Sequence, residues 1–405
     1  MASTRQQAED FSPASREWLK GSDAAERKRR GQYLTPRDLR ERLLDLVGLK
    51  PGMSVLDPGA GTGEFLASAL EREPELKLSG WDTDRGVLEV ARSLVPEADL
   101  RERSAIEPWT GEEFDLVIGN PPYFQLKATA AQKKKFHRVI SGRPNVFAFF
   151  FQAGIEALAD GGQLAYVVPP SLNNGAYFES LREYLGEVAA IEHLEVMDAS
   201  DLFDGANTAV QLIVLRKGAA GDRFRFERFS PESGFRRVIF SSDPEELAAQ
   251  FEGRKTLWQL GWSAVTGSIV WNQNRELLRA EAEVDTVPLI WSRNIGRGSI
   301  EFDGNPDRPE HIVSATAMEG PAVLVNRIVG AVGKGELRAA AFPKGERFLA
   351  ENHVNVLRPR AGAESVLPAD QLVGMINAEG VSERVRMLTG NSQISAKELT
   401  HLLPL

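Results

Sequence analysis

The chain has 405 residues, of which 42% are hydrophobic and 26% are charged, and its formal net charge is −9 at pH 7. This length exceeds one compact domain, so we expect two or three. The absence of cysteine excludes disulfides, thiolate catalysis and cysteine-based zinc sites. The five histidines are scattered, with no two at a metal-ligand spacing, so we expect no metal site.

The sequence also argues against a membrane protein. No apolar run approaches the ~20 residues that are needed to span a bilayer. The first fifteen residues are polar and lack the apolar core of a signal peptide. We therefore expect a cytoplasmic protein with no membrane partner.

Helices and strands alternate through the first half of the chain. A helical pattern covers 36–47, with Thr35 placed to cap it and Pro36 at the first helical position. The elements that follow are strands at 53–57, 77–82, 114–119, 163–169, 190–196 and 208–217, and helices at 64–73, 85–94, 146–159 and 176–188. This alternation predicts an α/β fold with a doubly wound, mostly parallel sheet. Ligands of such sheets bind at the carboxyl ends of the strands.

A change of pattern at Lys217 predicts the end of the first domain. Residues 218–222 read as a linker, and the sequence beyond them mixes short strand-like runs with turns and a few helices. Examples are the strand-like runs 223–229, 237–241 and 322–329 and the helical run 242–251. We therefore predict domains at 1–217 and 218–405, the second of mixed α+β structure.

A glycine-rich turn follows the first strand. Gly59, Gly61 and Gly63 let the backbone turn tightly beneath a ligand. Position 64 is Glu, so the pattern differs from the GxGxxG of dinucleotide-binding folds. Asp82 ends the next strand, where a carboxylate can accept both hydroxyls of a ribose. A turn followed by a solvent-facing aspartate is the simpler alternative, but this order of elements favours a cofactor of the nucleoside type.

The segment Asn120-Pro121-Pro122-Tyr123 directly follows the strand at 114–119. Two prolines make the loop rigid. The Asn120 side-chain carbonyl and the Pro121 backbone carbonyl can both accept hydrogen bonds from one NH2 group. An exocyclic amine is a poor nucleophile until two acceptors hold its hydrogens, so this loop suits amine methylation. Tyr123 offers a flat face on which a base can stack.

A basic window follows this loop. Residues 123–145 contain six cations and no carboxylate: Lys127, Lys133, Lys134, Lys135, Arg138 and Arg143. A charge run of this kind is often only a solvated loop. Its place beside the catalytic loop instead predicts contact with a DNA backbone, above all by Lys133, Lys134, Lys135 and Arg138. The cluster 27–30 can extend that surface or form a solvated helix end.

Four segments together resemble a known family. GQYLTP at 31–36, DPGAGTGEF at 57–65, WDTD at 81–84 and NPPY at 120–123 look like the N6-adenine DNA methyltransferases of restriction–modification systems. Their order is that of the gamma class, the TaqI-like branch, and the resemblance covers residues ~30–217. It implies S-adenosyl-L-methionine as cofactor, a flipped adenine in double-stranded DNA as substrate, and a target-recognition domain at the C-terminus. It also leaves open a cognate restriction endonuclease as a partner.

The resemblance assigns roles to the cofactor-side residues. Thr35 would hold the methionine carboxylate, Asp82 would bind the ribose, and Pro122 would touch the cofactor's adenine. The residues that would cradle the methionine moiety are Asp57, Pro58, Gly59 and Ala60, and Gly61 is a further cofactor-binding candidate. Ser104 stands where the family usually has an acidic residue that contacts the adenine amine. A hydroxyl accepts that hydrogen bond more weakly, unless Glu102 takes its place.

On the substrate side, the segment 167–185 resembles the family segment that ends in LR-x-x-L. By that match, Phe178 would pack against the flipped base opposite Tyr123. In the second half, residues of types suited to reading base edges or DNA backbone are Trp291, Arg293, Asn294, Asn326 and Arg327. Such residues on short strands are more often structural.

Two other functions stay open on the sequence alone. An NPPY loop also suits methylation of glutamine amides in release factors or of bases in ribosomal RNA, because an amide NH2 poses the same chemical problem. A DNA-binding specificity protein with an inactive catalytic half is the non-enzymatic alternative. The segment before the glycine turn and the ~190 residues after the sheet favour DNA methylation.

Overall fold

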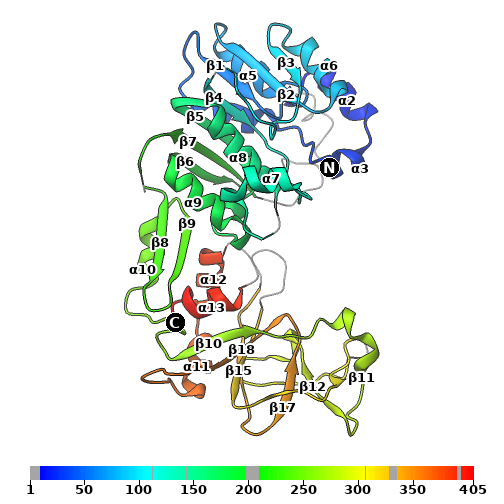
Figure 1. The fold of residues 1–405 in the computed structure, drawn as a ribbon, viewed down its shortest axis with the longest axis vertical. Coiled ribbons are helices and arrows are strands. Elements are labelled where there is room, and N and C mark those ends of the chain that lie inside the picture. Colours follow the sequence, from blue (N-terminus) through cyan, green and yellow to red (C-terminus); the bar gives the residue numbers. More distant parts are fainter. Residues whose placement is uncertain are drawn as a thin grey trace. The chain divides into compact units, whose positions relative to one another are not determined.

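A computed structural model of the chain describes residues 10–111, 113–142, 144–197, 209–221, 223–305, 307–327, 335–389 and 394–405. The chain divides into two compact units (Figure 1). The first comprises Met1–Phe226 with Val238–Pro244, and the second comprises Glu227–Arg237 with Glu245–Leu405. The assignment of cofactor binding to residues 1–217 and of target recognition to residues 218–405 stays a prediction.

The first unit is built on a seven-stranded sheet of order β3-β2-β1-β4-β5-β7-β6. Its strands are β1 (Ser54–Asp57), β2 (Lys77–Asp82), β3 (Asp99–Glu102), β4 (Phe114–Gly119), β5 (Leu158–Val168), β6 (Ala189–Met197) and β7 (Val210–Lys217). Strands β1 to β5 pair in parallel, whereas β7 is antiparallel to both of its neighbours. The predicted doubly wound, mostly parallel sheet is confirmed. The strand order reverses between β1 and β4, which is where such sheets bind ligands.

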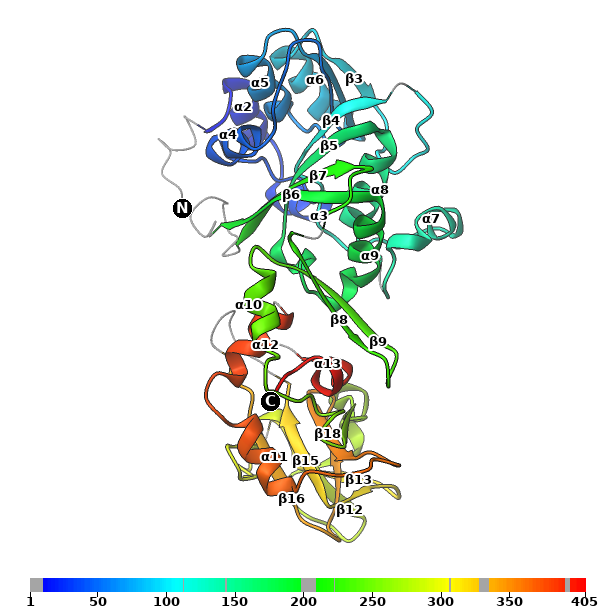
Figure 2. The ribbon, with the colours of Figure 1, turned by 90° about the vertical axis from the view of Figure 1, so that its left-hand side faces the viewer.

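Helices cover both faces of this sheet (Figure 2). The helices of this unit are α2 (Pro13–Gly21), α3 (Ala24–Arg30), α4 (Arg37–Asp45), α5 (Glu64–Arg72), α6 (Arg85–Leu94), α7 (Ala130–Lys135), α8 (Val146–Ala157) and α9 (Glu179–Val188), of which α7 buries no residue and projects away from the sheet. Apolar residues of α4 and α5 form one core with the sheet, and those of α8 and α9 form the other. Eleven of the twelve residues of α8 are buried, so this helix lies fully inside the unit.

Two local expectations were wrong. The helix predicted over 146–159 ends at Ala157, because Leu158 is already extended and pairs with Phe114 at the start of β5. Thr35 does not cap the next helix either. Pro36 holds the cap position of α4, and the Thr35 hydroxyl is used elsewhere, as described below.

The second unit contains two sheets, of order β10-β18-β15-β16 and β11-β13-β12-β17-β14. Their strands are β10 (Trp262–Thr266), β11 (Leu278–Arg279), β12 (Thr286–Ile290), β13 (His311–Val313), β14 (Met318–Glu319), β15 (Ala322–Asn326), β16 (Ala339–Phe342), β17 (Arg347–Ala350) and β18 (Val354–Pro359). The helices are α11 (Ala369–Ile376), α12 (Val381–Thr389) and α13 (Ala396–His401). The hairpin β8 (Arg225–Ser230) and β9 (Phe235–Phe240) and the helix α10 (Pro244–Ala249) stand where the division between the units falls. Mixed α+β structure therefore follows the sheet, as predicted.

None of the helices in the described ranges is long and apolar enough to cross a membrane. Within the same ranges there is also no group of three or more histidine and carboxylate side chains that could hold a metal ion.

Candidate active site

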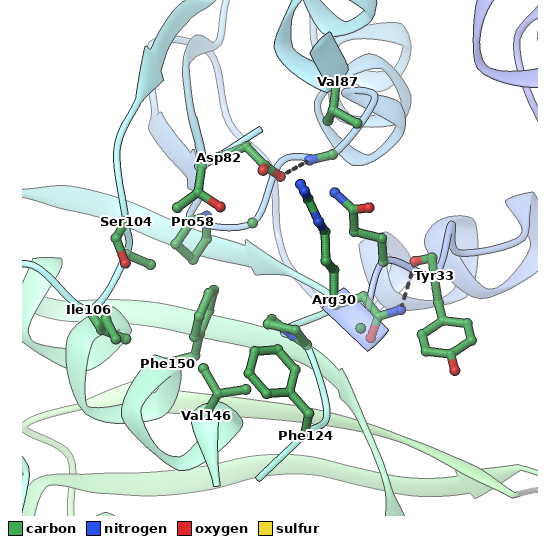
Figure 3. Close-up of a pocket in the computed structure, with 18 of the residues that line it drawn as sticks. Arg30, Tyr33, Pro58, Asp82, Val87, Ser104, Ile106, Phe124, Val146 and Phe150 are labelled. Carbon is green, nitrogen blue, oxygen red and sulfur yellow. Dashed lines mark hydrogen bonds between the residues drawn. The ribbon is translucent and has the colours of Figure 1, made fainter. Parts of the chain in front are cut away.

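A cavity of about 430 Å³ opens at the carboxyl ends of β1, β2 and β4 (Figure 3). Its walls come from the glycine turn after β1, the end of β2, the loop after β3, the NPPY loop, α8 and the N-terminal segment. The lining residues are Trp18, Arg29, Arg30, Gly31, Gln32, Tyr33, Leu34, Pro58, Gly59, Gly61, Asp82, Thr83, Val87, Arg103, Ser104, Ala105, Ile106, Asn120, Pro122, Phe124, Leu126, Val146 and Phe150. The predicted cofactor residues Pro58, Gly59, Gly61, Asp82, Ser104 and Pro122 are among them.

Asp82 ties the glycine turn to the second strand. The backbone N–H of Gly61 donates to Asp82 Oδ2 at 3.0 Å, and that of Asp84 donates to Asp82 Oδ1 at 2.9 Å. Gly61 adopts φ 53° and Gly63 adopts φ 86°, in the left-handed region that favours glycine. Burial raises the pKa of Asp82 above its usual range. Each carboxylate oxygen keeps a lone pair for a further donor, such as the two hydroxyls of a ribose.

Asp57 and Ala60 support the turn from beneath and are not lining residues. The backbone N–H of Gly59 donates to Asp57 Oδ1 at 3.0 Å, and that of Ala60 donates to the Trp81 carbonyl at 2.9 Å. Burial raises the pKa of Asp57 to about 7. A Cβ on Gly119 would lie 2.7 Å from Asp57 Oδ1, so glycine is required where β4 passes this carboxyl.

One end of the cavity is mostly apolar. Ile106, Val146 and Phe150 line it beside the Ser104 hydroxyl (Figure 3). Ser104 is half-buried, whereas Glu102 is exposed on β3 and does not line the cavity. The alternative in which Glu102 replaces an acidic residue at this position is therefore not favoured.

Arg103 is a lining residue that no pattern in the sequence singled out. Its guanidinium lies 4.3 Å from the ring centroid of Trp81 and 5.0 Å from that of Trp109. Its backbone N–H donates to the Asp82 carbonyl at 2.9 Å. The loop that carries Ser104 is thus fixed against the strand that carries Asp82.

The N-terminal segment supplies another wall of the cavity. Arg30 forms an ion pair with Asp84 at 3.2 Å, and the Gln32 amide donates to the same carboxylate at 3.3 Å. Figure 3 shows Arg30 extending toward Asp82. From the sequence, the cluster 27–30 could extend the DNA-contacting surface or form a solvated helix end. The position of Arg30 instead favours a contact with the cofactor.

The side-chain amide of Asn120 is held at both ends. Its Nδ2 donates to Thr35 Oγ1 at 3.0 Å and to the Tyr33 carbonyl at 3.4 Å. Its Oδ1 accepts from the Tyr123 hydroxyl, which also reaches the carbonyl of Val167. Burial raises the pKa of Tyr123 well above its usual range, so this hydroxyl stays a donor. Thr35 is not a lining residue, and its hydroxyl contacts Asn120.

The two aromatic residues proposed to clamp a base share one neighbour. The ring of Tyr123 meets Phe147 edge-on, with centroids 6.2 Å apart, and Phe178 packs against the same ring at 4.5 Å. Phe178 is only 9% exposed. In this state Phe178 is part of the core, and a stack opposite Tyr123 would require Phe147 and Phe178 to rearrange.

The fold brings carboxylates to the basic window that had none in sequence. Lys135 lies 3.6 Å from Glu156, and Arg138 pairs with Glu187. Lys133 and Lys134 are exposed on α7, and no carboxylate among the described residues lies within ion-pair distance of either. Arg143 lies outside the described residues. Of the four cations predicted to contact DNA, Lys135 and Arg138 thus form ion pairs, whereas Lys133 and Lys134, like Lys127 of the same window, form none among the described residues.

The residues considered as base readers in the second unit serve its scaffold. The Trp291 indole donates to the Pro309 carbonyl, and Arg293 pairs with Asp303 and Glu310. Asn294 and Asn326 are at most 3% exposed. The Arg327 guanidinium donates to the carbonyl of Asn352. These residues hold loops together, which agrees with the structural alternative.

Comparison with known proteins connects this site to a class of enzymes. Residues 89–203 match the family model described as Eco57I restriction-modification methylase. The modification methylase CviBIII of Paramecium bursaria Chlorella virus NC1A is 23% identical over 400 residues, 96% of this chain and 98% of that protein. The Type II methyltransferase M.CvrRI of Paramecium bursaria Chlorella virus XZ-6E is 25% identical over 387 residues, 95% of this chain and 96% of that protein.

Among solved structures, the methyltransferase subunit of a type I restriction-modification system from Streptococcus thermophilus is similar with a TM-score of 0.42 and 20% identity. That similarity covers 55% of this chain and 53% of the other. On the sequence matches, this chain is similar to an Eco57I restriction-modification methylase over residues 89–203 and to Type II methyltransferases over nearly its whole length.

Proposed function

We propose that this protein is a site-specific DNA methyltransferase that transfers a methyl group from S-adenosyl-L-methionine to the N6 amine of a flipped adenine. One observation carries the proposal: a single cavity contains both Asp82 with its glycine turn and the Asn120 amide. A nucleoside cofactor bound at the first end would direct its reactive group toward the second. Nearly full-length similarity to modification enzymes supports DNA as the substrate.

The cavity suits the proposed cofactor. Asp82 offers two carboxylate oxygens to ribose hydroxyls, and the turn Pro58–Gly61 passes close beneath without side chains that obstruct it. Ile106, Val146 and Phe150 give a purine an apolar slot, and the Ser104 hydroxyl is there for its polar edge. The volume of about 430 Å³ lies within the range of small-molecule sites.

S-adenosyl-L-methionine supplies a methyl group on a positively charged sulfur, which is electrophilic. The chain's part is to make the amine nucleophilic and to orient it. Asn120 Oδ1 and the Pro121 carbonyl would accept its two hydrogens, which draws the nitrogen lone pair out of conjugation with the ring. Tyr123 would stack on the base. The amine releases one proton after alkylation and needs no dedicated base, since the alkylated amine is acidic.

The target would have to leave the duplex to reach this site, because Asn120 is half-buried in the wall of the cavity. We assign the choice of sequence to the second unit. A restriction endonuclease that cuts at the same sequence would be the natural partner of such an enzyme.

Genome sequencing tests the proposal directly. Expressed in a host that lacks its own DNA methylation, the protein should leave N6-methyladenine at one short sequence motif. Single-molecule sequencing reports base, motif and strand together. Methylcytosine would overturn the adenine assignment but keep the amine chemistry. Unmodified DNA beside methylated ribosomal RNA or release factor would establish the first alternative function instead.

We further propose that Lys133 and Lys134 contact the DNA backbone. They are exposed on α7, close in sequence to the NPPY loop, and among the four cations predicted to contact DNA they are the two without a carboxylate partner among the described residues. Phosphate contacts of this kind add affinity without reading sequence.

Replacing both lysines with alanine should weaken binding to cognate and non-cognate duplexes by the same factor. The slope of log affinity against log salt should fall by about 0.9 for each phosphate that the variant no longer neutralises. Fluorescence anisotropy across a salt series measures both quantities. The matched control removes Lys50 and Lys77, two exposed lysines at the opposite, amino-terminal edge of the sheet. An unchanged slope in the Lys133/Lys134 variant would return α7 to the solvated-loop interpretation.

A further inference from the structure

The two ends of an asparagine amide have almost the same shape but opposite hydrogen-bonding character. In the reaction proposed above, on which this inference rests, only the oxygen end of Asn120 can accept a hydrogen from the target amine. With the amide rotated by half a turn, an NH2 group would face the amine, and activation would fail. The site therefore needs a device that fixes the orientation.

Among the described partners of the Asn120 side chain, the Tyr33 carbonyl can only accept and so decides the orientation, whereas the hydroxyls of Thr35 and Tyr123 can donate or accept and hold the amide in it. On the nitrogen side stand two acceptors, Thr35 Oγ1 at 3.0 Å and the Tyr33 carbonyl at 3.4 Å. On the oxygen side stands a donor, the Tyr123 hydroxyl. The Tyr33 carbonyl has no hydrogen to donate, so it would repel the oxygen of a rotated amide.

Thr35 is itself held in place by a buried network. The Arg40 guanidinium donates to the Thr35 carbonyl and to Ser68 Oγ, the latter at 2.9 Å. Arg40 also pairs with Glu64 at 3.1 Å, and the two side chains are only 4% and 9% exposed. Thr35 is 4% exposed. Its hydroxyl therefore meets Asn120 from a fixed position at the base of α4.

We propose that Thr35 is a positioning residue: its hydroxyl locks the Asn120 amide in the orientation that the Tyr33 carbonyl sets, with the amide oxygen toward the target amine. This role differs from the one that the family resemblance implies, which is to hold the methionine carboxylate. The two roles predict different kinetics. If Thr35 holds Asn120, its loss lowers the rate of methyl transfer at saturating substrate. If Thr35 binds the methionine carboxylate, its loss lowers the affinity for the cofactor.

The test compares Thr35→Val, which removes the hydroxyl at nearly constant volume, with Thr35→Ser, which keeps it. Calorimetry with S-adenosylhomocysteine measures cofactor affinity, and single-turnover methylation of a duplex with the sequenced motif measures the rate. For Thr35→Val we expect the rate at saturation to fall about 10- to 100-fold and the affinity to stay within about twofold. Thr35→Ser should restore the rate to within about threefold of wild type.

Weaker cofactor binding with an unchanged rate at saturation would overturn the lock, and so would a serine variant as slow as the valine variant. Thr389→Val is the matched control. It removes another buried threonine hydroxyl, which donates within its own helix at 2.8 Å, and should leave the rate unchanged.

A second measurement does not depend on catalysis. In chemical unfolding, Thr35→Val should cost less stability in an Asn120→Ala background than in wild type, because the bond between the two side chains is then already absent. Equal costs in both backgrounds would contradict the lock. A wild-type protein that methylates no DNA would refute the proposed function instead, and this cycle would still decide whether the two side chains are coupled.

Discussion

Asn120→Ala should lower the rate of methyl transfer by about 100- to 1,000-fold, the usual cost of removing one group that stabilises charge in a transition state. Asn120 Oδ1 is the acceptor proposed for the target amine, and no other described side chain on the NPPY loop offers a carbonyl oxygen. Affinity for S-adenosylmethionine should be largely intact, because the ribose and purine contacts are assigned to other residues. Single-turnover kinetics and calorimetry on the same preparation measure both quantities.

Asn377→Ala is the matched control for this experiment. It removes an amide that also makes two hydrogen bonds, with the backbone N–H of Ala339 at 2.9 Å and its carbonyl at 2.8 Å, but in the second unit. The Asn377→Ala variant should be less stable than wild type but should transfer methyl groups at the wild-type rate. Turnover by Asn120→Ala within tenfold of wild type would show that the proposed mechanism is wrong.

Asp82→Ala should weaken binding of S-adenosylmethionine by about 100-fold or more. Each hydrogen bond to a charged group contributes about 1.5–3 kcal/mol, and two ribose hydroxyls would lose their acceptors. The change also removes the acceptor for the Gly61 N–H, so the turn loses the bond that fixes it against β2. Calorimetry with S-adenosylhomocysteine measures the effect without DNA.

Asp99→Ala removes an exposed carboxylate from the start of the neighbouring strand β3 and should leave the affinity unchanged. If Asp82→Ala binds the cofactor within about fivefold of wild type, the ribose must lie elsewhere in the cavity. The assignment of the cofactor's purine to the apolar end of the cavity would then also need revision, because that assignment assumes that the ribose lies at Asp82.

The bounds expected for β2 and β4, at 77–82 and 114–119, agree with the structure. Five of the six residues of β4 are buried inside the parallel sheet, which its apolar sequence reflects, whereas β2 alternates buried and partly exposed residues. Strand β3 was missed. Its residues, Asp99–Glu102, are mostly exposed at the sheet edge, and no hydrophobic pattern distinguishes them from a loop. The end of α8 was misplaced because its apolar run continues without a break into β5.

The candidate site was predictable where one short motif carries the geometry. Asn120, Asp82 and Gly61 come from three separate segments, yet each lies at or just beyond the carboxyl end of a strand, and parallel strands end at one edge. Residues that act through the tertiary fold left no such signal. The contacts of Arg30 with Asp84 and of Lys135 with Glu156 join segments far apart in sequence. The sequence predicted that Thr35 caps the helix that follows it, because nothing in the neighbouring sequence indicates that its hydroxyl contacts Asn120.

The hydrogen bond from the Tyr123 hydroxyl to Asn120 Oδ1 has a consequence for small competitors. It is intramolecular, so the phenol occupies one of the two lone pairs of this oxygen whatever the concentration of free metabolites. A free adenine nucleoside that enters the cavity would have to find the remaining lone pair unaided. A base delivered by a bound duplex is tethered, so it would reach that lone pair at a much higher effective concentration. The proposed enzyme would thus favour bases of bound DNA over the free nucleotide pool.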